Sequence, residues 1–165
     1  MHHPFQRTTD GLKNVTFMPL FAIPNKPNGS GAGAAARDSK VAGTGRPARV
    51  LIVEDEYLIA LELENRLLEA GFVVTGIAAT ADEAISRARS EDPDLAIMDI
   101  RLAGRRDGVE AALELFRSFG IRSIFASAHA DSSTRKRAAP ASPIGWLQKP
   151  YPADALLRVI RDFVK

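Results

Sequence analysis

The stretch Leu95-Ala96-Ile97-Met98-Asp99 decides the fold, because four apolar residues lead directly into one aspartate. A short apolar run of this kind, preceded by Pro93 and followed by Gly104, is typical of a buried central strand in a parallel sheet. Parallel sheets bind their ligands at the carboxyl ends of the strands. Asp99 is therefore expected at the mouth of the sheet, although an aspartate that merely caps a loop would fit the same pattern.

Five strand–helix units alternate from Arg49 onward. The predicted strands are 50–53, 72–77, the run that ends at Asp99, 123–126 and 144–147. The predicted helices are 57–70, 80–90, 107–118, 131–139 and 153–164. This alternation predicts one doubly wound α/β domain with a five-stranded parallel sheet and right-handed crossovers.

Four of the predicted helices carry further local signals. The helix over 57–70 ends at Gly71, and its predicted inward face holds Leu58, Leu61, Leu67 and Leu68. Thr80 and Glu83 form the pattern of a capping box for the next helix. The helix over 107–118 is expected to turn inward Val109, Ala112, Leu113 and Phe116. The short helix over 131–139 is expected to end before Pro140 and Pro143, because proline lacks an amide donor.

Composition excludes several classes of protein. The chain has 165 residues, of which 45% are hydrophobic, and no apolar run approaches about 18 residues, so we expect a soluble protein without a membrane span. Zero cysteines exclude disulfides, thiolate metal sites and cysteine nucleophiles. The first residues lack the apolar core of a secretory signal, and a cytoplasmic location is expected.

Residues 1–48 differ in composition from the remainder. Six Lys and Arg residues against two Asp residues give this region a charge of +4, so the remainder carries −2 of the net +2. The stretch 25–36 is rich in Gly, Ala and Asn, a composition that cannot bury enough apolar surface to offset chain entropy. We therefore predict a disordered basic arm over 1–48 and one folded domain over 49–165.

The residues just past the predicted strands form a chemically coherent set. They are Glu54 and Asp55 after the first strand, Asp99 after the third, Ser127 after the fourth and Lys149 after the fifth. Carboxylates at one sheet edge repel each other unless a cation lies among them, and oxygen ligands suit Mg²⁺. With a hydroxyl and a lysine nearby, Asp99 is equipped to act as nucleophile in phosphoryl transfer and to form an aspartyl phosphate.

Two other uses of such a fold fit less well. A flavodoxin-type nucleotide binder needs a glycine- or hydroxyl-rich loop after the first strand, whereas the acidic run 54–56 would repel an anion. Aspartyl-phosphate phosphohydrolases place their nucleophile after the first strand with a second aspartate two residues later. Here Asp99 follows the third strand, and Arg101 stands at that spacing.

The chain resembles the receiver domains of two-component response regulators over about residues 49–165. The matching motifs are Val53-Glu54-Asp55-Glu56, Met98-Asp99, Asp107-Gly108, Ser127-Ala128 and Gln148-Lys149-Pro150-Tyr151. The resemblance implies a flavodoxin-like strand order, 2-1-3-4-5. Phe125-Ala126-Ser127 further resembles an alphaproteobacterial subgroup of often stand-alone receivers with a Phe-Ala-Thr signature, although Ser127 and Ala128 replace the usual Thr and Gly.

The resemblance also implies the metal site and the phosphoacceptor. Asp99 would accept a phosphoryl group from a sensor histidine kinase or a histidine phosphotransfer protein. Asp55, Asp99 and the backbone carbonyl of Arg101 would bind Mg²⁺ directly, and Glu54 would act mainly through metal-bound water.

Other positions would contact or respond to the phosphoryl group. Lys149, Ser127 and the backbone of Ala128 would contact its oxygens, and the bond between Lys149 and Pro150 would be cis. Trp146 stands where the family has its Tyr or Phe switch residue, so it would either act with Ser127 as a switch or simply fill the edge of the core. Arg101 and His129 would tune dephosphorylation, although His129 also suits a solvated loop.

The sequence therefore favours a single-domain phosphoacceptor switch rather than an enzyme, with Mg²⁺-dependent self-phosphorylation and slow dephosphorylation. No DNA-binding domain is expected, and the downstream protein partner is unknown. Output would come from conformational change or onward transfer, with the face of the fourth helix, fifth strand and last helix responding. Two alternatives stay open: a receiver-fold interaction module that is not phosphorylated, and an enzyme acting on a phosphorylated small molecule.

Overall fold

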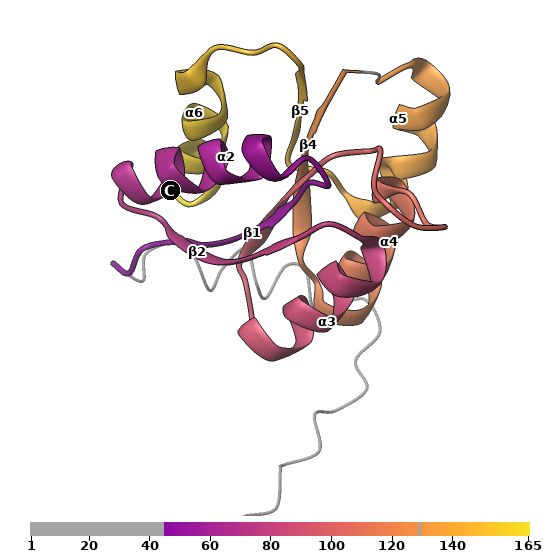
Figure 1. The fold of residues 1–165 in the computed structure, drawn as a ribbon, viewed down its shortest axis with the longest axis horizontal. Helices are drawn as coiled ribbons and strands as arrows, with labels where there is room; N and C mark the ends of the chain where they lie inside the picture. The colour runs from indigo at the N-terminus through magenta and orange to yellow at the C-terminus, as the bar shows by residue number, and fades with distance from the viewer. Residues whose placement is uncertain (1–44, 129) are drawn as a thin grey trace, which may run out of the picture.

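The computed structural model describes residues 45–128 and 130–165, and its elements alternate as predicted (Figure 1). The strands are β1 (Arg49–Val53), β2 (Val73–Ala78), β3 (Leu95–Met98), β4 (Arg122–Ser127) and β5 (Gly145–Gln148). The helices are α2 (Tyr57–Glu69), α3 (Ala81–Glu91), α4 (Gly108–Phe119), α5 (Ser132–Ala138), the 3-10 turn η1 (Ala139–Ala141) and α6 (Ala153–Phe163). Most of the predicted basic arm, residues 1–44, and His129 lie outside the described residues. No helix in the described part of the chain is long and apolar enough to cross a membrane.

The strands form one parallel sheet in the order β2-β1-β3-β4-β5, which confirms the predicted fold class. Figure 1 shows α2 and α6 over one face of the sheet and α3, α4 and α5 over the other. All four residues of β3 are buried, because helices cover both faces of the central strand. Asp99 is the residue that follows β3, so it lies at the carboxyl edge in the middle of the sheet.

Each face of the sheet has its own apolar core. Alternate strand residues such as Leu51 and Phe125 pack with α3 and α4, while Ile52 and Ile97 pack with α2 and α6. This division follows from the pleat, which sends successive side chains to opposite faces. The inward positions predicted for α4 are confirmed: Val109 and Ala112 are buried, and Leu113 and Phe116 are partly buried and pack against the same core.

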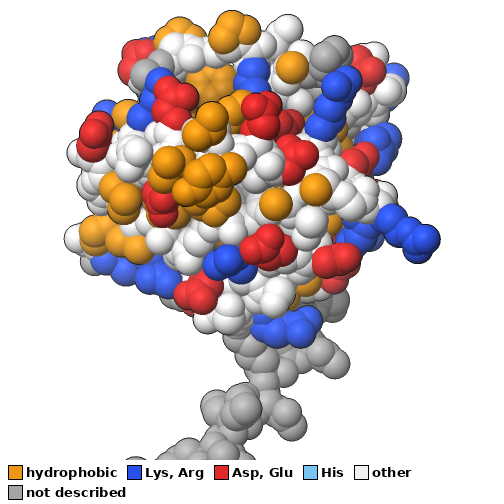
Figure 2. Space-filling view, viewed as in Figure 1, with side chains coloured by type: hydrophobic (Ala, Val, Ile, Leu, Met, Phe, Trp, Pro, Cys, Tyr) orange, Lys and Arg blue, Asp and Glu red, His pale blue; other side chains and the backbone are white. Residues whose placement is uncertain are grey.

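The predicted inward face of α2 was wrong in part. Leu67 is buried, but Leu58 is 75% and Leu68 is 52% exposed, and the buried stripe runs through Ala60, Leu63 and Leu67. Leu58 precedes Ala60 by two residues, which turns it about 200° around the helix away from the core. The helix therefore presents apolar side chains to solvent as well as to the core, and Figure 2 shows a hydrophobic patch over α2.

The capping signals are mostly confirmed. The Thr80 side chain accepts a hydrogen bond from the Glu83 amide at 3.1 Å, but the Glu83 carboxylate accepts from the Ala79 amide rather than from Thr80 itself. That backbone hydrogen bond is the main cause of a lowered pKa at Glu83. The α-helix α5 ends before Pro140, as predicted, and the chain continues as the turn η1.

Ser123 in β4 offers a test of the core. Its side chain is buried, and its hydroxyl has no hydrogen-bond partner among the residues that the structure describes. A buried hydroxyl left unpaired is costly, so we expect Ser123→Ala to raise the free energy of unfolding by about 1 kcal/mol, measured by urea denaturation. Ser132→Ala changes an exposed serine and is expected to stay within about 0.5 kcal/mol of the unchanged protein. A destabilised Ser123→Ala variant would contradict the assignment of an unpaired hydroxyl.

Candidate functional site

The carboxyl ends of the strands meet at one edge, where backbone hydrogen bonds continue the ladder for one further residue. The Glu54 amide donates to the Ala78 carbonyl at 2.9 Å, and the Asp99 amide donates to the Val53 carbonyl at 2.9 Å. The Lys149 amide donates to the Ser127 carbonyl at 3.1 Å. Three of the predicted site residues are thus fixed relative to the sheet by its own hydrogen bonds.

Lys149 joins two of the predicted carboxylates. Its Nζ donates to Glu54 Oε2 at 2.6 Å and to Asp99 Oδ2 at 2.8 Å. The Glu54 side chain is 4% exposed, that of Asp99 13% and that of Lys149 19%, so the three charges lie largely out of water. Charge-assisted hydrogen bonds of this kind are short and strong, and they fix the Asp99 carboxylate in orientation.

Burial and ion pairing shift the pKa values of Glu54 and Lys149 in opposite directions. Burial raises the pKa of the Glu54 carboxyl and is the largest influence on it, although the hydrogen bond and charge of Lys149 lower it. Burial alone would lower the pKa of the Lys149 ammonium, but hydrogen bonds to Asp99 and Glu54 outweigh it and leave this pKa raised. The lysine therefore stays a cation at neutral pH.

The other predicted site residues differ in their exposure and in their contacts with this centre. Asp55 follows Glu54 and is exposed. The Arg101 amide donates to Asp99 Oδ1 at 3.3 Å, while the residue itself is exposed. Ser127 is buried at the end of β4, and Ala128 beyond it is exposed. The predicted cis bond between Lys149 and Pro150 is confirmed.

Trp146 in β5 is the direct register partner of the buried Phe125 in β4 and stacks on it. The two ring centroids are 4.4 Å apart, and the rings are inclined by 14°. Trp146 also packs against the core beneath α3 and α4, and it is partly buried. In this structure it fills the edge of the core, as one of the two predicted roles requires.

Gly108 is a site residue to which the sequence interpretation assigned no role. A Cβ at this position would lie 1.8 Å from the backbone oxygen of Asp99 and 3.1 Å from the Cα of Ile100. The Gly108 amide donates to the Ile100 carbonyl at 2.8 Å, which draws the start of α4 onto the end of β3. The available signal was a glycine inside the predicted helix 107–118, because glycine within a helix is disfavoured by propensity.

The donor set is chemically suited to Mg²⁺, because Asp55 and Asp99 supply carboxylate oxygens and Arg101 a backbone carbonyl. Among the described residues, no three His, Cys, Asp or Glu side chains are already gathered as a metal cluster. Lys149 instead compensates the charges of Glu54 and Asp99. Asp55, Asp99 and the Arg101 carbonyl stay the predicted direct ligands of the ion, with Glu54 predicted to act through metal-bound water.

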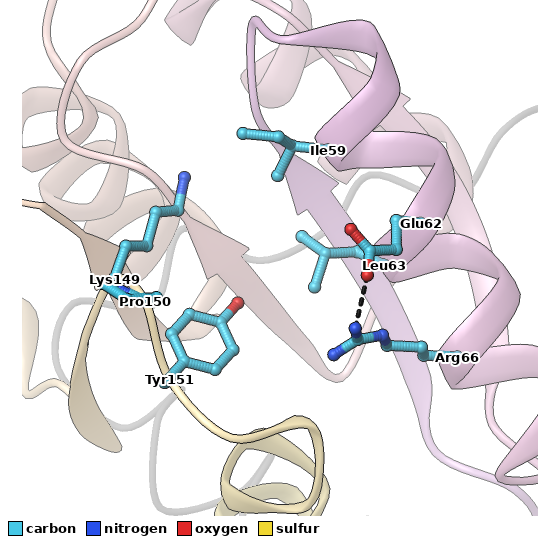
Figure 3. A pocket seen from close by; sticks show the side chains of 7 residues that line it. All are labelled: Ile59, Glu62, Leu63, Arg66, Lys149, Pro150 and Tyr151. Carbon is cyan, nitrogen blue, oxygen red and sulfur yellow. Dashed lines mark hydrogen bonds and ion pairs between the residues drawn. The ribbon is translucent and has the colours of Figure 1, made fainter.

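A pocket of about 440 Å³ lies beside this centre, between α2 and the segment that follows β5 (Figure 3). Its lining residues are Ile59, Glu62, Leu63, Arg66, Lys149, Pro150 and Tyr151. Arg66 and Glu62 form an ion pair on its α2 side. Burial raises the pKa of the Tyr151 hydroxyl, which therefore stays protonated at neutral pH. Lys149 belongs to both the pocket and the carboxylate centre, so the two are contiguous.

Known proteins share this sequence pattern. The family model described as the response regulator receiver domain matches residues 50–161. The transcriptional regulatory protein PdtaR of Mycobacterium tuberculosis is 36% identical over 114 residues, which make up 69% of this chain and 55% of PdtaR. This chain thus spans about half the length of that relative. The chemotaxis protein CheY of Halobacterium salinarum is 30% identical over 116 residues, 69% of this chain and 94% of CheY.

A solved structure agrees with these relatives. The signal receiver domain of a modulated diguanylate cyclase from Desulfovibrio desulfuricans superposes with a TM-score of 0.67 at 38% identity, covering 72% of this chain and 94% of that domain. The family match over residues 50–161 and the superposition on a solved receiver domain agree with each other. The chain therefore belongs to the family of response regulator receiver domains of two-component systems.

Proposed function

We propose that this protein is a phosphoacceptor switch of a two-component system, with Asp99 as the phosphoacceptor and a sensor histidine kinase or histidine phosphotransfer protein as the donor. The observation that carries the proposal is the Lys149 ammonium, which hydrogen-bonds the Asp99 carboxylate at 2.8 Å beside the buried Glu54. This arrangement orients a carboxylate at the sheet edge and supplies a cation for incoming phosphoryl oxygens.

The proposed reaction is a transfer between two side chains. An Asp99 carboxylate oxygen attacks the phosphorus of a phosphohistidine, the P–N bond breaks, and the imidazole leaves with the electron pair and takes up a proton. Mg²⁺, when bound, neutralises negative charge on the phosphoryl oxygens. Lys149 contacts one phosphoryl oxygen, and the Ser127 hydroxyl and Ala128 amide contact others.

Water then attacks the phosphorus of the aspartyl phosphate and releases inorganic phosphate. Arg101 and His129 are proposed to set the rate of this step, because they lie two residues beyond Asp99 and Ser127, respectively. Phe125-Ala126-Ser127 at the end of β4 also favours membership of the Phe-Ala-Thr subgroup. We further propose a cytoplasmic location, where a two-component phosphodonor would reach this protein.

The test is intact-protein mass spectrometry after incubation with acetyl phosphate, with Mg²⁺ or with a chelator. We expect one added phosphoryl group on the unchanged protein in Mg²⁺ and none on Asp99→Ala. Asp162→Ala, which changes an exposed aspartate in α6, is the control and is expected to be phosphorylated like the unchanged protein. No adduct on the unchanged protein would favour an interaction module that is not phosphorylated.

The exposed apolar side chains of α2 are suited to contact the phosphodonor protein. Leu58 stands one turn from the acidic segment that begins at Glu54, close to the edge where Asp99 lies, and it is 75% exposed. We expect Leu58→Glu to slow phosphoryl transfer from a phosphotransfer protein about tenfold, because a charge would replace an apolar contact that becomes buried when the two proteins bind. Transfer from acetyl phosphate is expected to be unchanged.

The control for Leu58→Glu is Leu68→Glu. Leu68 is also exposed, but it lies about 15 Å further along α2 and away from the acceptor edge. Transfer rates are compared by following the loss of phosphate from the labelled donor protein. Equal slowing in both variants would contradict a donor contact at the start of the helix.

A further inference from the structure

Two arginines of helix α5 contact the loops around the acceptor site, in addition to the core packing of the buried Ala138. The helix contains Arg135, Lys136 and Arg137 in succession and no acidic residue. Arg137 pairs with Asp107 at 2.7 Å, and Asp107 is the N-cap of α4 at the end of the loop that follows Asp99. The position of α5 is therefore linked to the loop after β3.

Arg135 links α5 to the second loop of the acceptor site. Its Nε donates to the carbonyl of Ala130 at 3.2 Å, and Ala130 lies three residues beyond Ser127. Its guanidinium carbon lies 5.0 Å from the centroid of the Trp146 ring in β5. One side chain thus contacts both the loop that leaves β4 and the indole of the edge strand.

The two partners in this cation–π contact differ in how freely they can move. Trp146 stacks on Phe125, which is fully buried, so rotation of the indole would disrupt packing in the core. Arg135 is exposed, and its neighbours Lys136 and Arg137 carry the same charge. A cation–π contact at an exposed site is weak, so the guanidinium can leave the indole at small cost.

We propose that Arg135, rather than rotation of Trp146, couples the phosphorylated site to α5. In the unphosphorylated protein Arg135 lies on Trp146 and holds α5 against β5. When the segment that carries Ser127 and Ala128 closes on the phosphoryl group, the Ala130 carbonyl moves, and Arg135 leaves the indole. This inference rests on the proposed phosphorylation of Asp99 and identifies how that site controls the α5 surface.

Removal of Arg135 should therefore favour the activated state. Because the contact stabilises only the resting conformation, its loss lowers the cost of the transition, and ligands of the activated site bind more tightly. We expect Arg135→Met to bind Mg²⁺ and beryllofluoride about fivefold more tightly than the unchanged protein. Its tryptophan emission without ligand should already be shifted toward that of the liganded protein.

The experiment uses the full chain, with calorimetry for affinity and fluorescence for the indole. Trp146 is the single tryptophan of the chain, so the emission reports on this residue alone. Lys136→Met removes an adjacent exposed cation and is expected to match the unchanged protein in both measurements. Arg135→Lys keeps the charge but loses the planar group and the Nε donor, so an intermediate affinity is expected.

The outcomes separate the two proposals. If the unchanged protein shows no Asp99-dependent heat with beryllofluoride, the proposed function fails and the coupling fails with it. If the unchanged protein binds but Arg135→Met has the same affinity and the same emission change as Lys136→Met, the coupling through Arg135 is overturned while the proposed function stands. Thermal unfolding of each variant checks that a lost response does not reflect a lost fold.

Discussion

Gly108→Ala is expected to lower the free energy of unfolding by about 3 kcal/mol, the upper end of what overpacking costs. The added methyl carbon would lie 1.8 Å from the Asp99 backbone oxygen and 2.8 Å from its carbonyl carbon. No rotamer change relieves this overlap, because both partners are backbone atoms. Either the start of α4 or the end of β3 has to move, and urea denaturation measures the cost.

The same substitution should reduce phosphorylation even where the variant is folded. The atom that blocks the methyl group belongs to the proposed phosphoacceptor itself, so relief of the overlap displaces Asp99 relative to Lys149. A displacement of about 1 Å at a reacting group costs about a hundredfold in rate. We expect a loss of this order in the rate of phosphorylation by acetyl phosphate, measured by intact mass at a temperature where the variant is folded.

Gly145→Ala is the matched control for Gly108→Ala. Its added methyl carbon would lie 3.2 Å from Val159 Cγ1, the end of a side chain that can adjust, and Gly145 is not held at a positive φ. A cost of about 1 kcal/mol or less and an unchanged rate of phosphorylation are expected. If Gly145→Ala lowered stability and the phosphorylation rate as much as Gly108→Ala, the losses in Gly108→Ala would not come from contact with Asp99.

The sheet was predictable from sequence because each strand is a short apolar run between breakers, and the central run 95–98 is buried on both faces. The buried face of α2 was not predictable from sequence. Leucines occur all round this helix, so periodicity alone did not separate the core stripe at Ala60, Leu63 and Leu67 from the exposed Leu58 and Leu68. Only packing against β1 and β2 decides that rotation.

The candidate site shows the same division. Glu54, Asp99 and Lys149 could be predicted to converge because parallel strands end at one edge. The contact of one ammonium with both carboxylates depends on side-chain rotamers and burial, which the sequence does not specify. The overlap at Gly108 and the contacts of Arg135 with Ala130 and Trp146 arise between segments whose relative positions in space cannot be predicted from the sequence.

Lys149→Met is expected to be the most damaging change in the charged centre. Methionine keeps much of the apolar stem but leaves the largely buried Glu54 and Asp99 carboxylates without their cation. Breaking a buried pair by removing one partner costs about 3–5 kcal/mol, and we expect a loss near 3 kcal/mol at pH 7.5 because the centre is partly open to water. Phosphorylation by acetyl phosphate should fall as well, since the cation proposed to contact the phosphoryl group is gone.

The pH dependence of this loss identifies its cause. The folded-state pKa of Glu54 is already raised above 4.5, so its ionised form costs stability as the pH rises through that value, and removal of Lys149 enlarges the cost. The folded-state pKa of Lys149 is raised above 10.5, so its stabilisation is present below that pH and disappears above it. The difference between the two proteins should therefore be small near pH 4, largest between about pH 7 and 9, and smaller again above 10.5.

Urea denaturation of the unchanged protein, Lys149→Met and Lys136→Met across this range, with and without Mg²⁺, completes the test. Lys136 is exposed in α5, so its removal should give a small difference that does not follow the same pH curve. In Lys149→Met a divalent cation can take over charge compensation of the carboxylates, and Mg²⁺ should stabilise this variant more than the unchanged protein. A loss of stability that is independent of both pH and Mg²⁺ would mean that Lys149 supports the fold by packing of its stem rather than by its charge.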